Sequence, residues 1–369
     1  MILDILKLYK VNLMKRKCLV IGIILFFITT SIIPSFAQVC ENPLRSGGTW
    51  LYVGGDGPGN YTTIRDAIHA SSDGDTVFVY DDSSPYNENI SIVHSIKLLG
   101  ENPNSTIIHS HEYHIIDVLT NDVTVEGFCL SGSVQGIFIE ANSCSITNNI
   151  IMSGGIHFYY TANNTITHNI ILGFRGIGIG LTGTTHTLIE NNSISGNFTG
   201  ISALESSNIL IINNRLSHIT QAIMLLECSS ANITNNVIMN ATSFAIFLQD
   251  PTATNQIISN MVMSCYWGIF LWLSHYQLIK NNIILDSGLG IKLEESNHNF
   301  ITHNFFQGNT VNAEFKESYQ NKWRRNFWDY PRILPYIIIG TNVFHQLPLK
   351  WLNFDWFPAQ EPSDSPGMD

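Results

Sequence analysis

The sequence predicts an all-β fold, a right-handed parallel β-helix (a solenoid) of about nine or more coils. The first observation is a motif, Ile-x-x-Asn-x-apolar, that recurs every 20 to 24 residues. The second is a small-Ile-x-apolar run that precedes each copy of the motif. Because 44% of the residues are apolar and only 13% are charged, the chain also has enough apolar side chains for a long core.

The asparagine motif defines the repeat. In every copy an Ile stands three residues before the Asn, and an apolar residue stands two residues after it. A straight strand would place two residues five apart on opposite faces, so the chain must bend between them. Asn tolerates the left-handed backbone of a tight corner, and its amide can hydrogen-bond along a ladder of like residues. We therefore expect a corner at Asn149, Asn169, Asn192, Asn214, Asn236, Asn260, Asn282 and Asn304.

The length of the repeat selects the architecture. Each repeat has room for two or three short strands whose inward residues alternate. A unit this small cannot bury its apolar face alone, so the units must stack as a solenoid. A β-propeller blade would need about forty residues, and the fixed leucine framework of leucine-rich repeats is missing. The parallel β-helix remains.

Both ends of the repeat region carry sequences that fit caps. Ile64, Ala67 and Ile68 have helical spacing and follow Thr62 and Thr63, the candidate N-caps, which predicts a short capping helix. An aromatic, Pro-containing C-terminal segment is expected to fold over the last coil. The predicted organisation is a signal peptide or N-terminal anchor at 1–37, a lead-in at 38–60, the β-helix with its N-terminal cap at 61–310, and a C-terminal cap and tail at 311–369.

The N-terminus indicates export. Basic residues from Lys15 to Lys17 precede an apolar run, and Ser35 and Ala37 fit a small-residue cleavage site. An uncleaved anchor is the alternative, since the run approaches the length of a membrane span; it would be the only membrane contact. Eight Asn-x-Ser/Thr sequons fit an exported glycoprotein. The net charge of -11 argues against a nucleic-acid partner.

The repeated units resemble those of right-handed parallel β-helix proteins of the pectin-lyase-like superfamily. Within it the chain most resembles the NosD-type copper-binding group and its archaeal surface relatives, over about residues 50 to 362. The stretch beginning "LYVGGDGPGNYTTIRDAIHA" is similar to the N-terminal cap of that group, and "NFWDY" and "NFDWFPAQEP" are similar to its C-terminal cap. The resemblance implies the fold and no particular activity, because the superfamily spans lyases, hydrolases, esterases and non-enzymes.

Acidic residues follow the outward strand positions of three neighbouring repeats. Glu205, Glu227 and Asp250 would stack about 5 Å apart if the coils are in register. Carboxylates this close can raise a pKa for general acid catalysis, hold a hard cation such as Ca²⁺, or act as a glycoside-hydrolysing pair. The alternative is that acidic residues simply suit a solvent-facing turn. A lyase-like site would also need an Arg or Lys base, and none is found beside them.

Aromatic residues form a second candidate site. Phe247, Phe270 and Trp272, with Met224, are expected to make an exposed strip on adjacent coils. Such a strip suits stacking against sugar rings or contact with a protein partner. The alternative is that a loop or the C-terminal tail covers it.

The segment "HSHEYH" forms a third candidate site, with His109, His111 and His114. Two His at i and i+2 on a strand share a face and could chelate Cu or Zn. Ordinary surface histidines are the alternative.

These features predict an exported cell-surface or periplasmic-type protein that binds a polysaccharide, another glycan or an envelope protein without catalysis. A carbohydrate-active enzyme, a glycoside hydrolase or a polysaccharide lyase, is the first alternative. NosD-like copper handling is the second. The only cofactors these alternatives imply are Ca and Cu.

Overall fold

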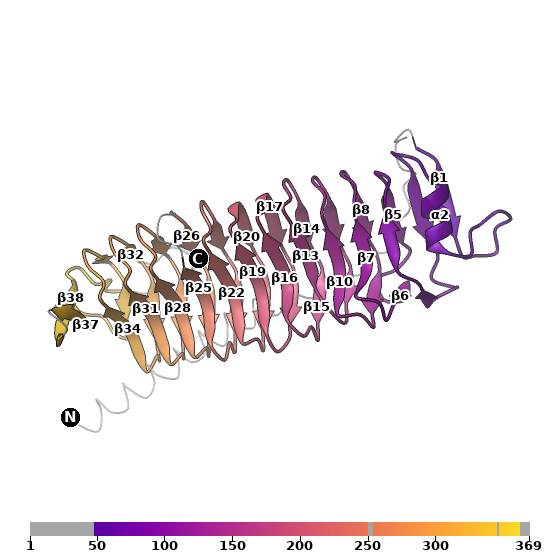
Figure 1. Ribbon diagram of the computed structural model, residues 1–369. Coiled ribbons are helices and arrows are strands. Elements are labelled where there is room, and N and C mark those ends of the chain that lie inside the picture. Colours follow the sequence, from indigo (N-terminus) through magenta and orange to yellow (C-terminus); the bar gives the residue numbers. More distant parts are fainter. Residues whose placement is uncertain (1–47, 250–253, 345–346, 362–369) are drawn as a thin grey trace, which may run out of the picture. The chain divides into compact units, whose positions relative to one another are not determined.

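The computed structural model describes residues 48–249, 254–344 and 347–361. Their strands form a right-handed parallel β-helix of about 13 turns, so the predicted fold is confirmed (Figure 1). The signal peptide or anchor predicted at residues 1–37 lies outside the described residues. Within these ranges, no helix combines the length and the apolar character needed to cross a membrane.

Each regular coil contributes one strand to each of three columns, which we call A, B and C in chain order. Column A contains β4 (Ile90–Ile92), β7 (His114–Val118), β10 (Gln135–Ile139), β13 (Ile156–Tyr159), β16 (Ile177–Thr182), β19 (Thr199–Leu204), β22 (Gln221–Leu226), β25 (Phe244–Gln249), β28 (Trp267–Trp272), β31 (Leu289–Glu294), β34 (Val311–Lys316) and β37 (Tyr336–Phe344).

Column B contains β1 (Trp50–Val53), β2 (Thr76–Val79), β5 (Lys97–Gly100), β8 (Thr124–Glu126), β11 (Ser145–Thr147), β14 (Thr165–Thr167), β17 (Thr185–Glu190), β20 (Ser207–Ile212), β23 (Asn232–Thr234), β26 (Gln256–Ile258), β29 (Leu278–Lys280), β32 (Phe300–Thr302), β35 (Lys322–Arg324) and β38 (Leu347–Asp355).

Column C contains β3 (Tyr86–Asn87), β6 (Ile107–His109), β9 (Cys129–Ser131), β12 (Ile150–Ile151), β15 (Ile170–Leu172), β18 (Ser193–Ser195), β21 (Arg215–Ser217), β24 (Val237–Met239), β27 (Met261–Met263), β30 (Ile283–Leu285), β33 (Phe305–Gln307) and β36 (Phe327–Trp328).

At the corner between columns B and C, two adjacent residues have different roles. The first adopts the left-handed backbone, as Asn235 does with a φ of 57°. The second is buried, and its amide bonds to the next coil: Asn236 Nδ2 donates to Asn260 Oδ1 over 3.0 Å. Equivalent bonds form a ladder, which confirms the predicted corner, through Asn149, Asn169, Asn192, Asn214, Asn236, Asn260, Asn282, Asn304 and Asn326.

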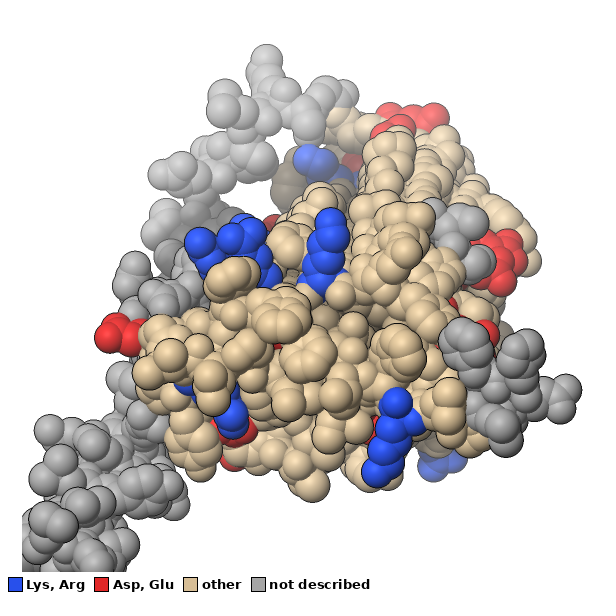
Figure 2. Space-filling view, turned by 90° about the vertical axis from the view of Figure 1, so that its left-hand side faces the viewer, with Lys and Arg blue, Asp and Glu red and all other residues tan. Residues whose placement is uncertain are grey.

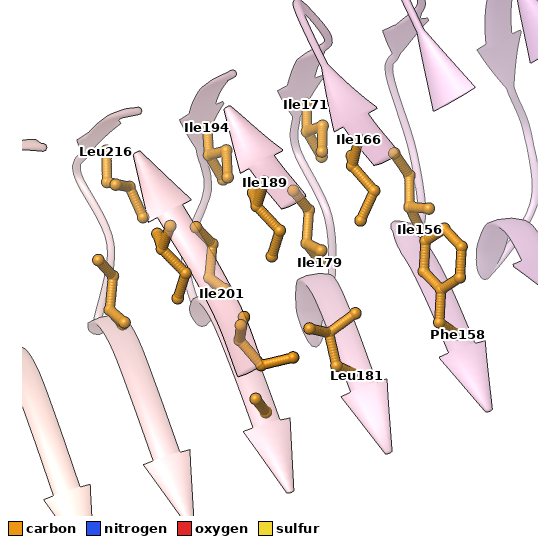
Figure 3. Packing of buried hydrophobic residues seen from close by; sticks show 14 of the residues in the cluster. Ile156, Phe158, Ile166, Ile171, Ile179, Leu181, Ile189, Ile194, Ile201 and Leu216 are labelled. Carbon is orange, nitrogen blue, oxygen red and sulfur yellow. The ribbon is translucent and has the colours of Figure 1, made fainter. Parts of the chain in front are cut away.

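The apolar residues on either side of this corner form the core. Ile166 and Ile189 of column B and Ile171 and Ile194 of column C are almost completely buried. Figure 3 shows them in ranks beside the inward residues of column A. Because each rank repeats once per coil, every coil buries its apolar face against two neighbours.

The small residue that precedes the first inward Ile of the column A strands from β10 to β31 has a steric cause. A Cβ at Gly268 would lie 2.4 Å from the carbonyl oxygen of Gly290, and a Cβ at Gly200 would lie 2.7 Å from that of Ala222. Both distances are too short for an unshifted side chain, so the coils approach closely at this position.

A helix, α2 (Ile64–Ala70), precedes the regular coils and contacts β1, β2 and β4. Thr63 is its N-cap and accepts a hydrogen bond from the Asp66 backbone N–H over 3.1 Å. Its buried residues are Ile64, Ala67 and Ile68, the three whose spacing predicts it.

The stack extends beyond the predicted range of 61–310 at both ends. β1 already pairs in parallel with β2, and β34, β35 and β36 form a further complete coil. The asparagine column continues at Asn326, but Trp323 and Trp328 occupy its two apolar positions, and the change from aliphatic to aromatic residues hides this coil in the sequence.

An antiparallel hairpin, β37 with β38, follows this last coil. β37 also pairs with β34, and β38 pairs with β35. The ring of Tyr336 stacks on that of Trp328 with centroids 4.0 Å apart, so aromatic packing continues into the hairpin.

Candidate ligand-binding face

The outward face of column A carries a group of aromatic side chains, which we call the aromatic strip. It consists of Phe244, Phe247, Trp267, Phe270 and Trp272 from β25 and β28. The strands pair in register, so Phe247 lies beside Phe270 and Phe244 beside Trp267. Ring centroids are 4.8 Å apart for Phe244 and Phe247, 5.1 Å for Phe247 and Phe270, and 5.3 Å for Trp267 and Phe270. Four rings of the strip are therefore in continuous contact, and Trp272 lies at the end of the same strand as Trp267 and Phe270.

The strip is less exposed than the sequence predicts. Phe247 is only 7% exposed, because rings from its own strand and from the next coil contact it on two sides. Phe270 is half-buried, and Trp272 is 38% exposed. The expectation that all three rings are exposed is thus wrong for Phe247. Trp272 is the most accessible of the three predicted residues.

Charged residues from β31 and β34 border the strip. Lys292 Nζ lies 4.5 Å from the ring centroid of Trp267 and 4.9 Å from that of Phe270. It also pairs with Glu294 over 3.2 Å, and Lys316 pairs with the same carboxylate over 2.7 Å. Burial alone would raise the pKa of Glu294, but its hydrogen bonds to the two lysines lower it overall. This edge is therefore a fixed polar border beside the rings.

The N-terminal half of the same face holds histidines. His114 Nδ1 contacts Asp117 Oδ1 at 2.6 Å, and the imidazole stacks on Phe138 with centroids 4.7 Å apart. His157 follows Phe138 in register on the next coil. Burial, with the charge of His114 as the second cause, lowers the pKa of His157 to about 4, so it is neutral at pH 7.

His157 was not among the predicted site residues. The space for its ring depends on the residue at the same position of the next coil, Gly180. A Cβ at Gly180 would lie 2.6 Å from His157 Nδ1, so this glycine makes room for the ring. That close approach leaves no signal in the sequence.

The three predicted metal-binding histidines do not come together. His109 Nε2 and His111 Nε2 are 3.3 Å apart, and His109 Nδ1 also contacts the Ser131 hydroxyl at 3.0 Å. His114 belongs instead to column A, where it contacts Asp117. The predicted trio is therefore wrong as a set, because the chain turns from column C to column A between His111 and His114.

Glu205 and Glu227 lie where the sequence places them. Each follows a column A strand, has a left-handed backbone and is exposed. The Glu205 backbone N–H donates to Leu226 O over 3.0 Å, so the two residues sit on adjacent coils. Asp250, the third member, lies outside the described residues.

A family model described as "Periplasmic copper-binding protein (NosD)" matches residues 68–218 and 198–344, together well over half of the chain. The chain belongs to the NosD family. The resemblance found in the sequence is thereby confirmed.

This NosD-family chain also matches a cell surface glycoprotein from Methanothermus fervidus. The two are 34% identical over 96 residues, which is 25% of this chain and 16% of the relative. The match thus spans about a sixth of that longer protein.

Three solved structures resemble the fold. DFA-IIIase from Arthrobacter chlorophenolicus A6, solved without its lid, has a TM-score of 0.55 at 12% identity, covering 76% of this chain and 94% of that one. The catalytic unit of the GH87 alpha-1,3-glucanase from Streptomyces thermodiastaticus has a TM-score of 0.53 at 14% identity, covering 76% of this chain and 69% of that one. The AlgE4 A-module, a mannuronan C-5 epimerase of Azotobacter vinelandii, has a TM-score of 0.51 at 13% identity, covering 70% of this chain and 88% of that one. Identities this low show the fold alone.

The family description raises the question of a copper site. Among residues 48–249, 254–344 and 347–361, no three His, Cys, Asp or Glu side chains converge as metal ligands would. His109 and His111 supply two imidazole nitrogens and no third protein donor of this kind.

Proposed function

We propose that this NosD-family protein works outside the cytoplasm as a non-catalytic glycan-binding protein, with the aromatic strip as its contact surface. The observation that carries the proposal is the continuity of the strip across two coils, where the ring centroids of Phe247 and Phe270 are 5.1 Å apart, with Trp272 exposed at its side. Flat rings bury the apolar faces of sugars, and a nearby lysine and carboxylate can bond to hydroxyl groups.

Two further facts support this proposal. The relative from Methanothermus fervidus is a cell surface glycoprotein, which fits a place among surface glycans. The N-terminal segment has the sequence pattern of an export signal. An envelope protein is the other partner that an apolar surface of this kind would suit.

The experiment is a glycan array probed with the purified protein, followed by calorimetric titration of any ligand found. Trp272→Ala should weaken binding about tenfold, since stacking on an exposed indole contributes on the order of 1 kcal/mol or more. Tyr276→Ala is the matched control, because Tyr276 is exposed in the same coil but stacks on His298 instead. A wild-type protein that binds no glycan on the array would reject the proposal.

Copper binding is a second candidate, favoured by the 3.3 Å contact between His109 and His111 and by the family description. The test is the copper content of the purified protein after loading and dialysis. His109→Ala should reduce retained copper, whereas His298→Ala, which removes an exposed histidine elsewhere, should not. No retention by the wild type would reject this function.

A further inference from the structure

A cationic groove lies on column B near the C-terminal end of the solenoid. It consists of two adjoining cavities of about 390 and 350 Å³ that share His303 and Arg325. Lys280, Phe300 and Arg324 line the first cavity, and Phe357 lines the second. Figure 2 looks at this end of the molecule and shows several Lys and Arg side chains near one another on its upper part, with others lower down.

The strand pattern explains why these side chains face outward. In β29, β32 and β35 the middle residues, Ile279, Ile301 and Trp323, are buried in the core. The residues on either side of them therefore point away from it. Lys280, Thr302 and Arg324 lie side by side in register on three successive coils.

The corner residues add to the same charge. His303 and Arg325 take the left-handed position beside the asparagine ladder, with φ of 55° and 56°. Desolvation lowers the pKa of His303, and Arg325, Lys280 and Arg324 lower it further. Lys280, Arg324 and Arg325 are thus all close enough to the His303 imidazole to lower its pKa.

These cations have no acidic partner in the described part of the chain. Lys292 and Lys316 pair with Glu294, but Lys280, Arg324 and Arg325 form no ion pair there. Asp355 lies nearby but is fully buried, and backbone, amide and indole N–H groups donate to it. In a chain of net charge -11, a groove whose cations form no ion pair with the described residues indicates an anionic ligand.

The two aromatic residues that line the groove, Phe300 and Phe357, indicate which kind of anion it binds. Phe300 is 40% exposed and Phe357 67% exposed. The guanidinium carbon of Arg324 lies 5.8 Å from the centroid of the Phe357 ring. Aromatic faces suit sugar rings, and guanidinium groups bind carboxylate or sulfate in a bidentate manner.

We propose that this groove binds an acidic saccharide, a glycan that carries carboxylate or sulfate groups, through Arg324, Arg325 and Lys280. The inference goes beyond the proposed function, because it assigns a second site on a different column with its own ligand class. The aromatic strip of column A plays no part in it, so each proposal can fail while the other stands.

The experiment titrates the purified protein with oligogalacturonate, with a neutral oligosaccharide of equal length, and with inorganic phosphate and sulfate. We expect binding of the acidic saccharide, weakened by added salt, and no binding of the neutral one. Arg324→Gln and Arg325→Gln should each weaken it about tenfold, since each removes one charge-assisted contact. Phe300→Ala should weaken it as well.

The controls separate this site from others. Arg175→Gln removes an exposed arginine from the connection between β15 and β16, outside the groove, and should leave binding unchanged. Trp272→Ala should also leave it unchanged. Circular dichroism verifies that each variant is folded. The proposal is overturned if acidic and neutral saccharides bind equally, if folded Arg324→Gln and Arg325→Gln variants bind like the wild type, or if simple anions bind as tightly as the saccharide.

Discussion

The side chain of Asn326 donates from Nδ2 to Oδ2 of Asp355 over 3.0 Å, and this bond ends the asparagine ladder. The same carboxylate accepts the Asn326 backbone N–H over 2.9 Å and the Trp328 indole N–H over 3.1 Å. Each ladder residue needs an acceptor on the next coil, and the described residues after Asn326 form no further complete coil. A buried carboxylate supplies acceptors without adding a donor that would need a partner.

Replacing Asp355 with alanine should therefore destabilise the protein by about 3 kcal/mol or more. It leaves the buried N–H groups of Asn326 and Trp328 without acceptors, and each such group costs about 1–3 kcal/mol. Asp355→Asn should cost less, since one oxygen acceptor remains. Urea denaturation measures the loss, and hydrogen exchange of the Trp328 indole N–H locates it. A loss below about 0.5 kcal/mol for Asp355→Ala would show that water replaces the carboxylate.

The two residues of one corner should respond differently to mutation. Asn236→Ala should cost about 3 kcal/mol, because Asn236 Nδ2 donates to Ile211 O over 2.8 Å and to Asn260 Oδ1 over 3.0 Å inside the core. Asn235→Ala should cost about 1 kcal/mol, the penalty of a left-handed backbone, and Asn235→Gly should cost almost nothing. The midpoints of urea denaturation test this order, and equal losses at both positions would contradict the division of roles.

Sequence reasoning found this corner because the same residue type recurs there. It expected a turn between columns A and B as well, but it missed the second ladder that hydroxyl side chains form there. There the Ser274 backbone N–H donates to Ser296 Oγ over 3.1 Å, and Ser296 in turn donates to Ser318 Oγ over 3.0 Å. Earlier coils have Thr184, Ser206 or Cys228 at this position, so no single residue type recurs at this corner in the sequence.

The candidate sites were harder to predict than the fold. The sequence places Phe247 and Phe270 on one face, but the burial of Phe247 depends on which rings contact it from the neighbouring coil. The cationic groove was not predicted because Lys280 lies 44 and 45 residues before Arg324 and Arg325, and because the two arginines belong to a coil whose core positions are aromatic. The alternation of inward and outward residues along a strand predicts which face a side chain lies on. It does not predict which charged side chains lack an ion-pair partner.

His157 should make the stability of the protein depend on pH. Its folded pKa of about 4 lies below the model-peptide value of 6.5. Between these values the unfolded chain binds a proton that the folded chain does not, so stability falls as the pH drops from 6.5 to 4. The slope approaches about 1.4 kcal/mol per pH unit for one such group. Below pH 4 this contribution becomes constant.

The measurement compares urea denaturation of the wild type and His157→Gln at several pH values from 7 to 4. Other titrating groups contribute to both proteins, so the difference between the two curves isolates His157. The variant should lose less stability than the wild type on acidification. Parallel curves would contradict the neutral state of this imidazole in the folded protein.

Glu205 and Glu227 provide the test of the enzymatic alternative. Both are exposed at left-handed corners, and neither forms an ion pair in the described part of the chain. Enzymes tune a general acid by burial and by close charged neighbours, and an exposed corner offers little burial. We therefore expect no reducing ends and no unsaturated products from a polysaccharide panel, with or without Ca²⁺, and unchanged glycan binding by Glu227→Gln. Products released by the wild type and lost in Glu227→Gln, with Glu295→Gln as the matched corner control, would instead establish catalysis at these corners.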